Sequence, residues 1–203
     1  VPLNDDHLKP DTNHKRSFLN KPLLHTFWTD VGDIDVYKSS LKDEITSWLF
    51  KLKESNISDW AVIYVDGSES RKGNKATKLL PRSSVIDKIK SDFPSMKNSV
   101  ERCISLIDPQ RTDTKATESF QQFLNRLRSL LLVSYSKQLT KHEELVRAQR
   151  ENRTAKNWDF FDFFFLQEEL AFAFGMLSLY EDALVQYDEL DALFSQFVIN
   201  SNL

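Results

Sequence analysis

The sequence predicts an α/β module, built on a small and mostly parallel sheet with crossover helices, followed by a long helix and a helical hairpin. Short apolar runs of strand length alternate with amphipathic helical segments in the first half of the chain. A charged helical pattern then covers residues 117–153, and two apolar helical stripes follow it. We therefore expect three regions: an irregular N-terminal arm over residues 1–21, the α/β module over 22–116, and the helical part over 117–203.

The α/β module should contain three strands and two helices. Apolar runs of strand length occupy residues 23–28, 59–65 and 102–107, and the second run is apolar throughout, as in a strand covered on both faces. Between these runs, apolar residues recur every three or four positions over 36–54 and again over 83–93, which opens on two capping serines. Because a βαβαβ order needs crossover connections, we expect the strands to be parallel.

The helical pattern over 117–153 would span about 55 Å as one unbroken α-helix at about 1.5 Å per residue. This length exceeds what the sheet needs, so we expect the helix to join the α/β module to the hairpin and to be kinked or broken near 150–157. Six aromatic residues follow within the segment 157–165, NWDFFDFFF. We expect these rings to clamp the long helix to the hairpin; the alternative is that they form a surface for a partner subunit.

The hairpin is predicted over Leu166–Phe197, as two helices that face each other across a tight turn. An apolar stripe marks each helix, with Leu166, Leu170, Phe174 and Leu177 in the first and Tyr180, Ala183, Leu184, Tyr187, Leu190 and Phe194 in the second. The pattern imitates one tetratricopeptide (TPR)-like unit, although no second copy occurs in the chain. Because one such unit cannot bury both of its faces, the hairpin either docks on the preceding elements or begins a solenoid.

Composition favours an ordinary globular protein of the cytoplasm. The chain is 40% hydrophobic and 28% charged, and no apolar run approaches the roughly 20 residues of a membrane span. Its single cysteine, Cys103, lies in an apolar run, which predicts a small buried hydrophobe in a reducing compartment. The net charge of -3 is uneven, because the residues from Asn157 onward contain nine acids and no Lys or Arg. Such a field can steer a partner; the alternative is a set of solvated helix faces.

The sequence contains no catalytic, cofactor-binding or metal-binding motif that we recognise. The basic loop 66–79 fails the G-x-x-x-x-G-K-[ST] spacing of a phosphate-binding loop, and the run NKAT at 74–77 lacks the acid of a guanine-reading N-K-x-D. The four histidines are scattered, and aromatic and basic residues occupy different parts of the chain, unlike those of a nucleic-acid binder. Two alternatives to a scaffold stay open: a degenerate GTPase-like nucleotide-binding module, and a module that binds anionic membrane surfaces.

Five segments carry a resemblance to a known family. They are PLLHTFWTD, DVYKSSLKDEITSW, LLPRSSVIDKIKSDF, NRLRSLLLVSYSKQL and QEELAFAFGMLSLYEDALVQYDELDALFSQFVIN. Together they lie within residues 22–200 and closely resemble the N-terminal region of the subunit-10 family of the TRAPP (transport protein particle) complexes, which is specific to TRAPP II. Members of that family are several times longer than this chain.

The resemblance implies a non-catalytic scaffold and tethering subunit of TRAPP II, without a cofactor. In that family the complex promotes guanine-nucleotide exchange on Rab GTPases during vesicle transport, and the exchange chemistry lies on small core subunits. The implied partners are a small longin-type subunit resembling sedlin and the other TRAPP II-specific subunits, with Rab GTPases as indirect partners. The implied location is cytoplasmic and peripheral at Golgi membranes, with no nucleic acid bound.

The partner-binding residues are expected on the last helix of the hairpin. That helix combines apolar and acidic side chains, and no family motif identifies individual contacts. We expect the following residues to face either the next repeat or a partner: Tyr187, Asp188, Asp191, Phe194 and Phe197.

Overall fold

The computed structural model describes residues 22–67, 84–95, 99–111 and 113–199. The expected N-terminal arm lies outside the described residues, as do residues 68–79 of the basic loop. The chain divides into two compact units, of which the first contains Leu23–Ser134 and the second continues from Tyr135. This division falls in the middle of the long helix, whereas the sequence-based division at residue 117 falls close to its start.

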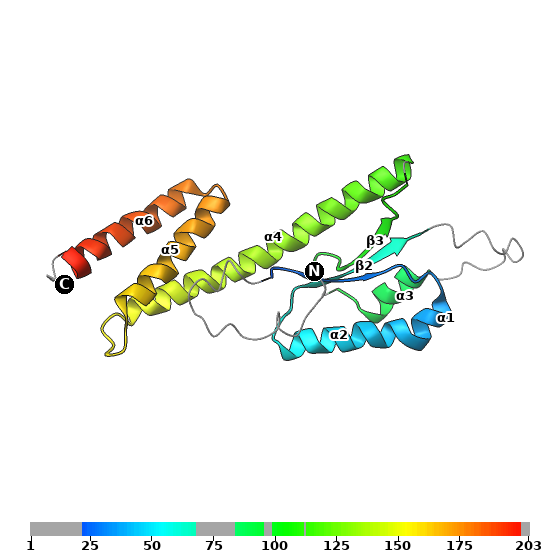
Figure 1. Ribbon diagram of the computed structural model, residues 1–203, viewed down its shortest axis with the longest axis horizontal. Helices are drawn as coiled ribbons and strands as arrows, with labels where there is room; N and C mark the ends of the chain where they lie inside the picture. Colours follow the sequence, from blue (N-terminus) through cyan, green and yellow to red (C-terminus); the bar gives the residue numbers. More distant parts are fainter. Residues whose placement is uncertain (1–21, 68–83, 96–98, 112, 200–203) are drawn as a thin grey trace, which may run out of the picture. The chain divides into compact units, whose positions relative to one another are not determined.

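The first unit is built on a sheet of three parallel strands (Figure 1). They are β1 (His25–Thr29), β2 (Trp60–Asp66) and β3 (Cys103–Ile107), with β2 in the middle. In the register of the sheet, Val62 pairs with Phe27 on one side and with Cys103 on the other. The α/β fold that the alternating apolar runs predict is therefore confirmed.

One face of the sheet is covered by the helices that connect the strands. α1 (Ile34–Val36), the π-helical turn η2 (Tyr37–Leu41) and α2 (Lys42–Glu54) follow one another without a gap, and α3 (Val85–Asp92) lies between β2 and β3 in sequence. The core on this face consists of Tyr37, Leu41, Ile45, Val62, Tyr64, Val85, Ile89 and Cys103. The prediction that Cys103 is a small buried hydrophobe is confirmed.

Local hydrogen bonds set the ends of these helices. The hydroxyl of Ser84 accepts from the N–H of Asp87, and the Asp87 carboxylate accepts from the N–H of Ser84, which forms a capping box at the start of α3. The bond to Ser84 lowers the pKa of Asp87. After α2, Asn56 adopts a left-handed φ of 56°, and the N–H of Ile57 donates to the carbonyl of Leu52 at 2.8 Å.

The other face of the sheet packs against the first half of α4 (Thr114–Glu151). The core there consists of Ala61, Ile63, Ile104, Leu106, Phe123 and Leu130. Successive residues of β2 therefore enter different cores, because side chains alternate between the two faces of a strand. Burial on both faces explains why β2 is apolar from Trp60 to Val65, as predicted.

The 38 residues of α4 form one continuous helix, which ends at Glu151 within the region where the sequence predicts a kink or break. The chain then turns, and the indole N–H of Trp158 donates to the carbonyl of Gln149 at 3.0 Å. This bond fixes the path of the returning segment against the end of α4.

The second unit contains the end of α4 and a helical hairpin. α5 (Phe160–Met176) and α6 (Tyr180–Phe194) run antiparallel, and η4 (Ser195–Ile199) continues α6 as a π-helical turn (Figure 1). The buried core of this unit consists of Val146, Phe163, Leu170, Phe174 and Ala183. The predicted long helix and hairpin are both confirmed.

The turn between α5 and α6 is closed by backbone hydrogen bonds. Ser178 adopts a left-handed φ of 62° and donates its N–H to the carbonyl of Gly175 at 3.0 Å. The N–H of Leu179 donates to the carbonyl of Phe174, also at 3.0 Å. This pair of bonds is a Schellman motif, which satisfies carbonyls at the end of α5 and turns the chain sharply.

Candidate partner-binding surface

The apolar residues of α6 divide into two stripes, of which only one is buried. Ala183 and Leu190 enter the interior of the unit. The other stripe is rotated from them by roughly 65° on average, at about 100° per residue. It contains Tyr180, Leu184, Tyr187 and Phe194, whose exposed fractions are 69%, 59%, 45% and 41%. The single apolar stripe that the sequence predicts on this helix thus contains both residues that are buried and residues that are exposed.

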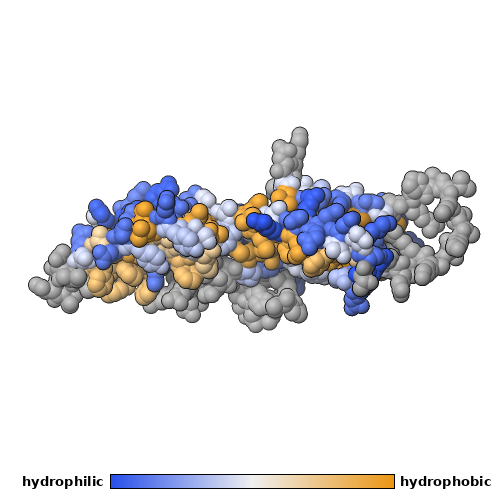
Figure 2. Space-filling view, turned by 90° about the horizontal axis from the view of Figure 1, so that it is seen from above, coloured by the Kyte–Doolittle hydropathy of each residue, from blue (hydrophilic) through white to orange (hydrophobic). Residues whose placement is uncertain are grey.

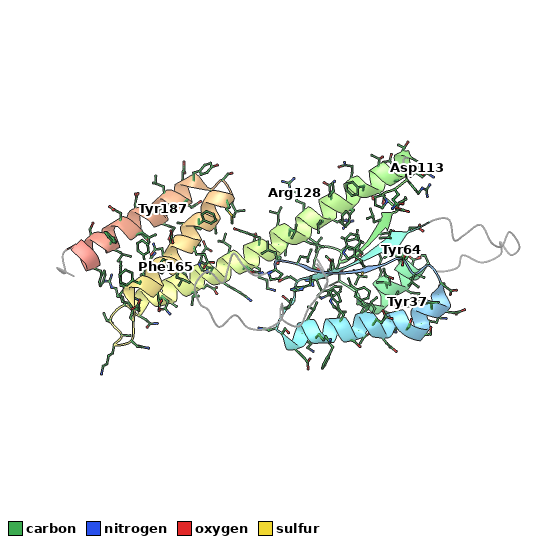
Figure 3. All side chains as sticks on the ribbon, in the orientation of Figure 1. Tyr37, Tyr64, Asp113, Arg128, Phe165 and Tyr187 are labelled. Atoms are coloured by element: carbon green, nitrogen blue, oxygen red, sulfur yellow. The ribbon has the colours of Figure 1, made fainter. Side chains whose placement is uncertain are left out.

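α5 carries a matching open stripe. It contains Phe161, Phe165, Phe172 and Met176, which are 58%, 38%, 51% and 52% exposed. The residues that α5 buries in the core of the unit, Phe163, Leu170 and Phe174, lie on the opposite side of the helix. We call the two open stripes together the hairpin face. Figure 2 shows apolar residues at the surface of the part of the chain that holds α5 and α6, and Figure 3 labels Tyr187 and Phe165 on it.

The end of α4 packs against residues of the hairpin other than those of the hairpin face. Nε2 of His142 lies 2.9 Å from the carbonyl oxygen of Leu166, and the guanidinium of Arg150 pairs with the carboxylate of Glu189. Glu189 also accepts a hydrogen bond of 2.6 Å from the side-chain amide of the fully buried Gln167. These polar contacts fix α4, α5 and α6 to one another and involve no side chain of the hairpin face.

The structure groups four of the five predicted partner-binding residues. Tyr187, Asp188, Asp191 and Phe194 are all exposed on α6, and neither aspartate has an ion-pair partner among the described residues. Phe197 is only half-buried and lies elsewhere: its ring stacks on Phe160, with 5.3 Å between the ring centroids. A role for these residues in partner binding stays a prediction.

The aromatic segment before the hairpin divides its rings between two environments. Phe163 is buried, and the ring of Trp158 lies 5.7 Å from it and 5.5 Å from Phe197. These rings join the end of α4 to the hairpin, as the sequence predicts. Phe161 and Phe165 instead belong to the hairpin face, where they are 58% and 38% exposed, although the ring of Phe161 still lies 5.3 Å from that of Phe160.

Comparison with known proteins identifies the family. A family model described as "Trafficking protein particle complex subunit 10-like, N-terminal" matches residues 1–153, about three quarters of the chain. The chain belongs to this family. The resemblance noted in the sequence is therefore confirmed.

Individual relatives of this family also match the hairpin. The chain is 46% identical over 195 residues to trafficking protein particle complex subunit 10 of Homo sapiens, and 43% identical over 187 residues to the subunit of the same name from Drosophila melanogaster. These matches cover 96% and 92% of this chain but only 15% and 16% of the relatives. A trafficking protein particle complex II-specific subunit 130 homolog of Arabidopsis thaliana is 30% identical over 173 residues, covering 82% of this chain and 12% of the relative. No solved structure matches the chain significantly.

The described part of this family member contains no group of His, Cys, Asp and Glu side chains that could hold a metal ion. Within the same residues, no helix is both long and apolar enough to cross a membrane. The nucleotide-binding and membrane-surface alternatives depend on the basic loop, of which residues 68–79 lie outside the description.

Sequence reasoning missed two features of this surface. The open stripe of α5 was detectable, because Phe161, Phe165, Phe172 and Met176 recur at intervals of four, seven and four residues. The network of Arg150, Glu189 and Gln167 was not, because its members are far apart in sequence and only the fold brings them together.

Proposed function

We propose that this chain forms part of a non-catalytic scaffold and tethering subunit of a TRAPP II complex. Through other subunits it would support guanine-nucleotide exchange on Rab GTPases and vesicle transport at Golgi membranes. Membership of the subunit-10 family supports this proposal, as do the names of its relatives, which are those of complex subunits.

The observation that carries the proposal is the hairpin face. Eight large apolar side chains, four on each helix, are at least 38% exposed there. Large apolar side chains that are exposed in this number on two packed helices are typical of an interaction site. Aromatic residues with large contact areas dominate the energetics of such sites, and Phe161, Tyr187 and Phe194 supply them here.

The proposed partners are a small longin-type subunit resembling sedlin and other TRAPP II-specific subunits. The acids that flank the open stripe of α6, Asp188 and Asp191, favour a partner surface with basic residues at its rim. Peripheral residence at Golgi membranes would then follow from the assembled complex.

Co-purification with purified TRAPP small subunits tests the proposal. The tagged chain should retain at least one subunit, and Phe194→Asp should abolish that retention, since a charge placed in an apolar contact is left unpaired and desolvated. Tyr187→Asp should act in the same direction. Unchanged retention by both variants would contradict the proposal.

The matched control is Phe50→Asp. Phe50 is 60% exposed on α2 of the first unit, so the same apolar-to-acid change there should leave retention intact. Far-UV circular dichroism of all three variants should equal that of the parent chain, because each substituted residue is at least 41% exposed.

A further inference from the structure

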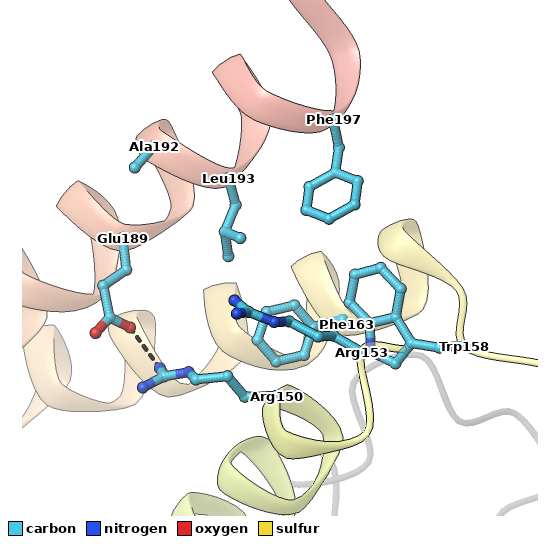
Figure 4. Close-up of a pocket in the computed structure, with 8 residues that line it drawn as sticks. All are labelled: Arg150, Arg153, Trp158, Phe163, Glu189, Ala192, Leu193 and Phe197. Carbon is cyan, nitrogen blue, oxygen red and sulfur yellow. Dashed lines mark hydrogen bonds and ion pairs between the residues drawn. The ribbon is translucent and has the colours of Figure 1, made fainter. Parts of the chain in front are cut away.

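A small apolar pocket opens in the second unit between the end of α4 and the last turns of the chain (Figure 4). Its volume is about 210 Å³. Trp158, Phe163, Ala192, Leu193 and Phe197 supply its apolar wall. It lies on a part of the hairpin distinct from the hairpin face, because none of these five residues belongs to either open stripe.

The apolar wall is pre-formed by ring contacts. The indole of Trp158 is held by its hydrogen bond to the carbonyl of Gln149, and its ring contacts both Phe163 and Phe197. Because these side chains are already ordered, they lose little conformational entropy when a ligand binds. The pocket is therefore suited to receive an apolar group without rearrangement.

The charged side chains that line the pocket differ in whether they already have a partner. Arg150 and Arg153 both line it, together with the single carboxylate of Glu189. Glu189 is already occupied, because it pairs with Arg150 and accepts from the amide of Gln167 (Figure 4). The guanidinium of Arg153 has no ion pair or hydrogen bond to any described residue. One positive charge beside the apolar wall is therefore available to pair with a ligand.

We infer that this pocket binds a short acidic–apolar peptide segment of a partner protein. A leucine or phenylalanine side chain of the peptide enters the pocket, and a carboxylate next to it in the peptide pairs with Arg153. Guanidinium and carboxylate match each other through two parallel hydrogen bonds, which makes arginine the preferred receptor for such a group.

Size and charge favour a peptide over other ligands. Pockets for small molecules and cofactors usually measure roughly 300–1,000 Å³, and this one is smaller, as suits a single anchoring side chain. α6, which forms one wall, carries Glu181, Asp182, Asp188, Glu189 and Asp191 and no basic residue. An extended polyanion such as a nucleic acid or an acidic membrane would place charge along the whole of that helix and be repelled, whereas a short peptide brings its carboxylate only to Arg153.

Nuclear magnetic resonance of the chain with a synthetic peptide tests the inference. The probe is acetyl-Asp-Glu-Leu-Phe-Ser-Gly-amide, titrated to millimolar concentration while the four indole N–H cross-peaks are followed. The cross-peak of Trp158, assigned from the spectrum of Trp158→Phe, should move in a saturable way. Those of Trp28, Trp48 and Trp60, which lie in the first unit, should stay in place.

Two peptide controls separate the roles of charge and anchor. Acetyl-Asn-Gln-Leu-Phe-Ser-Gly-amide keeps the anchor without the charges, and acetyl-Asp-Glu-Ala-Ala-Ser-Gly-amide keeps the charges without the anchor. Loss of the anchor should weaken binding at least about tenfold, and loss of the charges about threefold or more, as expected for a buried anchor and for an exposed ion pair.

Variants of the chain complete the test. Arg153→Glu should weaken binding of the probe at least about tenfold, whereas Arg128→Glu, the same change at an exposed site of α4 in the first unit, should not. Ala192→Trp should block the pocket without removing a core residue, because Ala192 is exposed. The inference is overturned if the Trp158 cross-peak does not move, if the uncharged peptide binds equally well, or if Arg153→Glu has no effect. Binding of anionic vesicles in place of the probe through Arg153 would also overturn it.

Discussion

His142 on α4 and Glu169 on α5 meet inside the second unit, with Nε2 of the histidine 3.8 Å from Oε2 of the glutamate. Both side chains are about 5% exposed. The same nitrogen lies 2.9 Å from the carbonyl oxygen of Leu166, and because a carbonyl can only accept, Nε2 carries the hydrogen. A buried polar pair thus connects α4 to α5 across an interface that is otherwise mostly apolar.

Loss of one member of this pair should destabilise the second unit strongly. We expect His142→Ala to lower its free energy of unfolding by about 3 kcal/mol, because Glu169 would remain buried without the imidazole. Replacing both residues by leucine should restore part of the loss, since the double change no longer leaves one member of the pair buried without the other. Urea denaturation followed at the Trp158 indole measures the effect. Lys141→Ala, at an exposed neighbour on α4, should change the free energy of unfolding by less than about 0.5 kcal/mol. A loss as large as that of His142→Ala would contradict a specific role for the His142–Glu169 pair.

Tyr37 and Asp92 form the corresponding polar contact in the first unit. The buried Tyr37 donates its hydroxyl to the Asp92 carboxylate at 2.7 Å, and Lys42 lies 3.1 Å from the same oxygen. Burial, reinforced by this bond, raises the pKa of Tyr37, and the bond from Tyr37 is the main cause that lowers the pKa of Asp92. We expect Tyr37→Phe to cost about 1 kcal/mol of unfolding free energy at pH 7.

The cost of Tyr37→Phe should depend on pH in one direction. A carboxyl whose pKa is lowered by folding stabilises the native state above its ordinary pKa of 3.8, and loses that contribution as the pH falls through the lowered value. The difference between parent and variant should therefore be constant from about pH 5 to 7 and shrink below pH 4. Guanidinium titrations at several pH values measure this difference. A cost that grows on acidification would show that Asp92 is not the partner.

The thiol of Cys103 should be unreactive in the folded protein. Its side chain is fully buried, and burial raises the pKa of the thiol to about 12, with Glu101 adding to the shift. We expect no reaction with dithionitrobenzoate at pH 8 in native buffer and complete reaction in guanidinium. Ser105→Cys, at an exposed position of the same strand, should react at once in native buffer. Rapid reaction of the native parent chain would contradict the placement of Cys103 in the core.

The turn of the hairpin should tolerate glycine better than serine. Ser178 holds a φ of 62°, a region that costs a side-chain-bearing residue about 1 kcal/mol or more. We expect Ser178→Gly to raise the free energy of unfolding of the second unit by up to about 1 kcal/mol, since Schellman turns favour glycine there. Ser178→Ala keeps the side-chain strain and should bring no gain. Thermal denaturation of the three chains checks the order, and a stabilised alanine variant would refute the explanation.

Much of the fold could be predicted because local patterns encode it. The continuous apolar run around Ile63 requires burial on both faces, so it predicts a central strand. The serine at 84 marks the start of α3 through its own hydroxyl. The break after α4 coincides with a polar segment, whereas the change from one unit to the other inside that helix leaves no local signal.

The surface was less predictable, because burial is a property of neighbours rather than of a residue. Leu184 and Leu190 are chemically identical and lie on the same helix, yet Leu190 is 3% exposed and Leu184 is 59% exposed. Phe197 was expected beside Phe194 on a partner surface, and the structure instead stacks it on Phe160. Only the packing of α4 and α5 decides which of these side chains faces inward.

The sequence by itself determined the order of strands and helices along the chain, the serine cap of α3 and the membership of the family, because these depend on spacing along the chain. The tertiary structure alone decided which stripe of α6 is open, which carboxylate pairs with Arg150, and that Arg153 lies beside an apolar pocket without an ion-pair partner among the described residues. Those relationships join residues that are distant in sequence, and contacts of that kind exist only once the chain has folded.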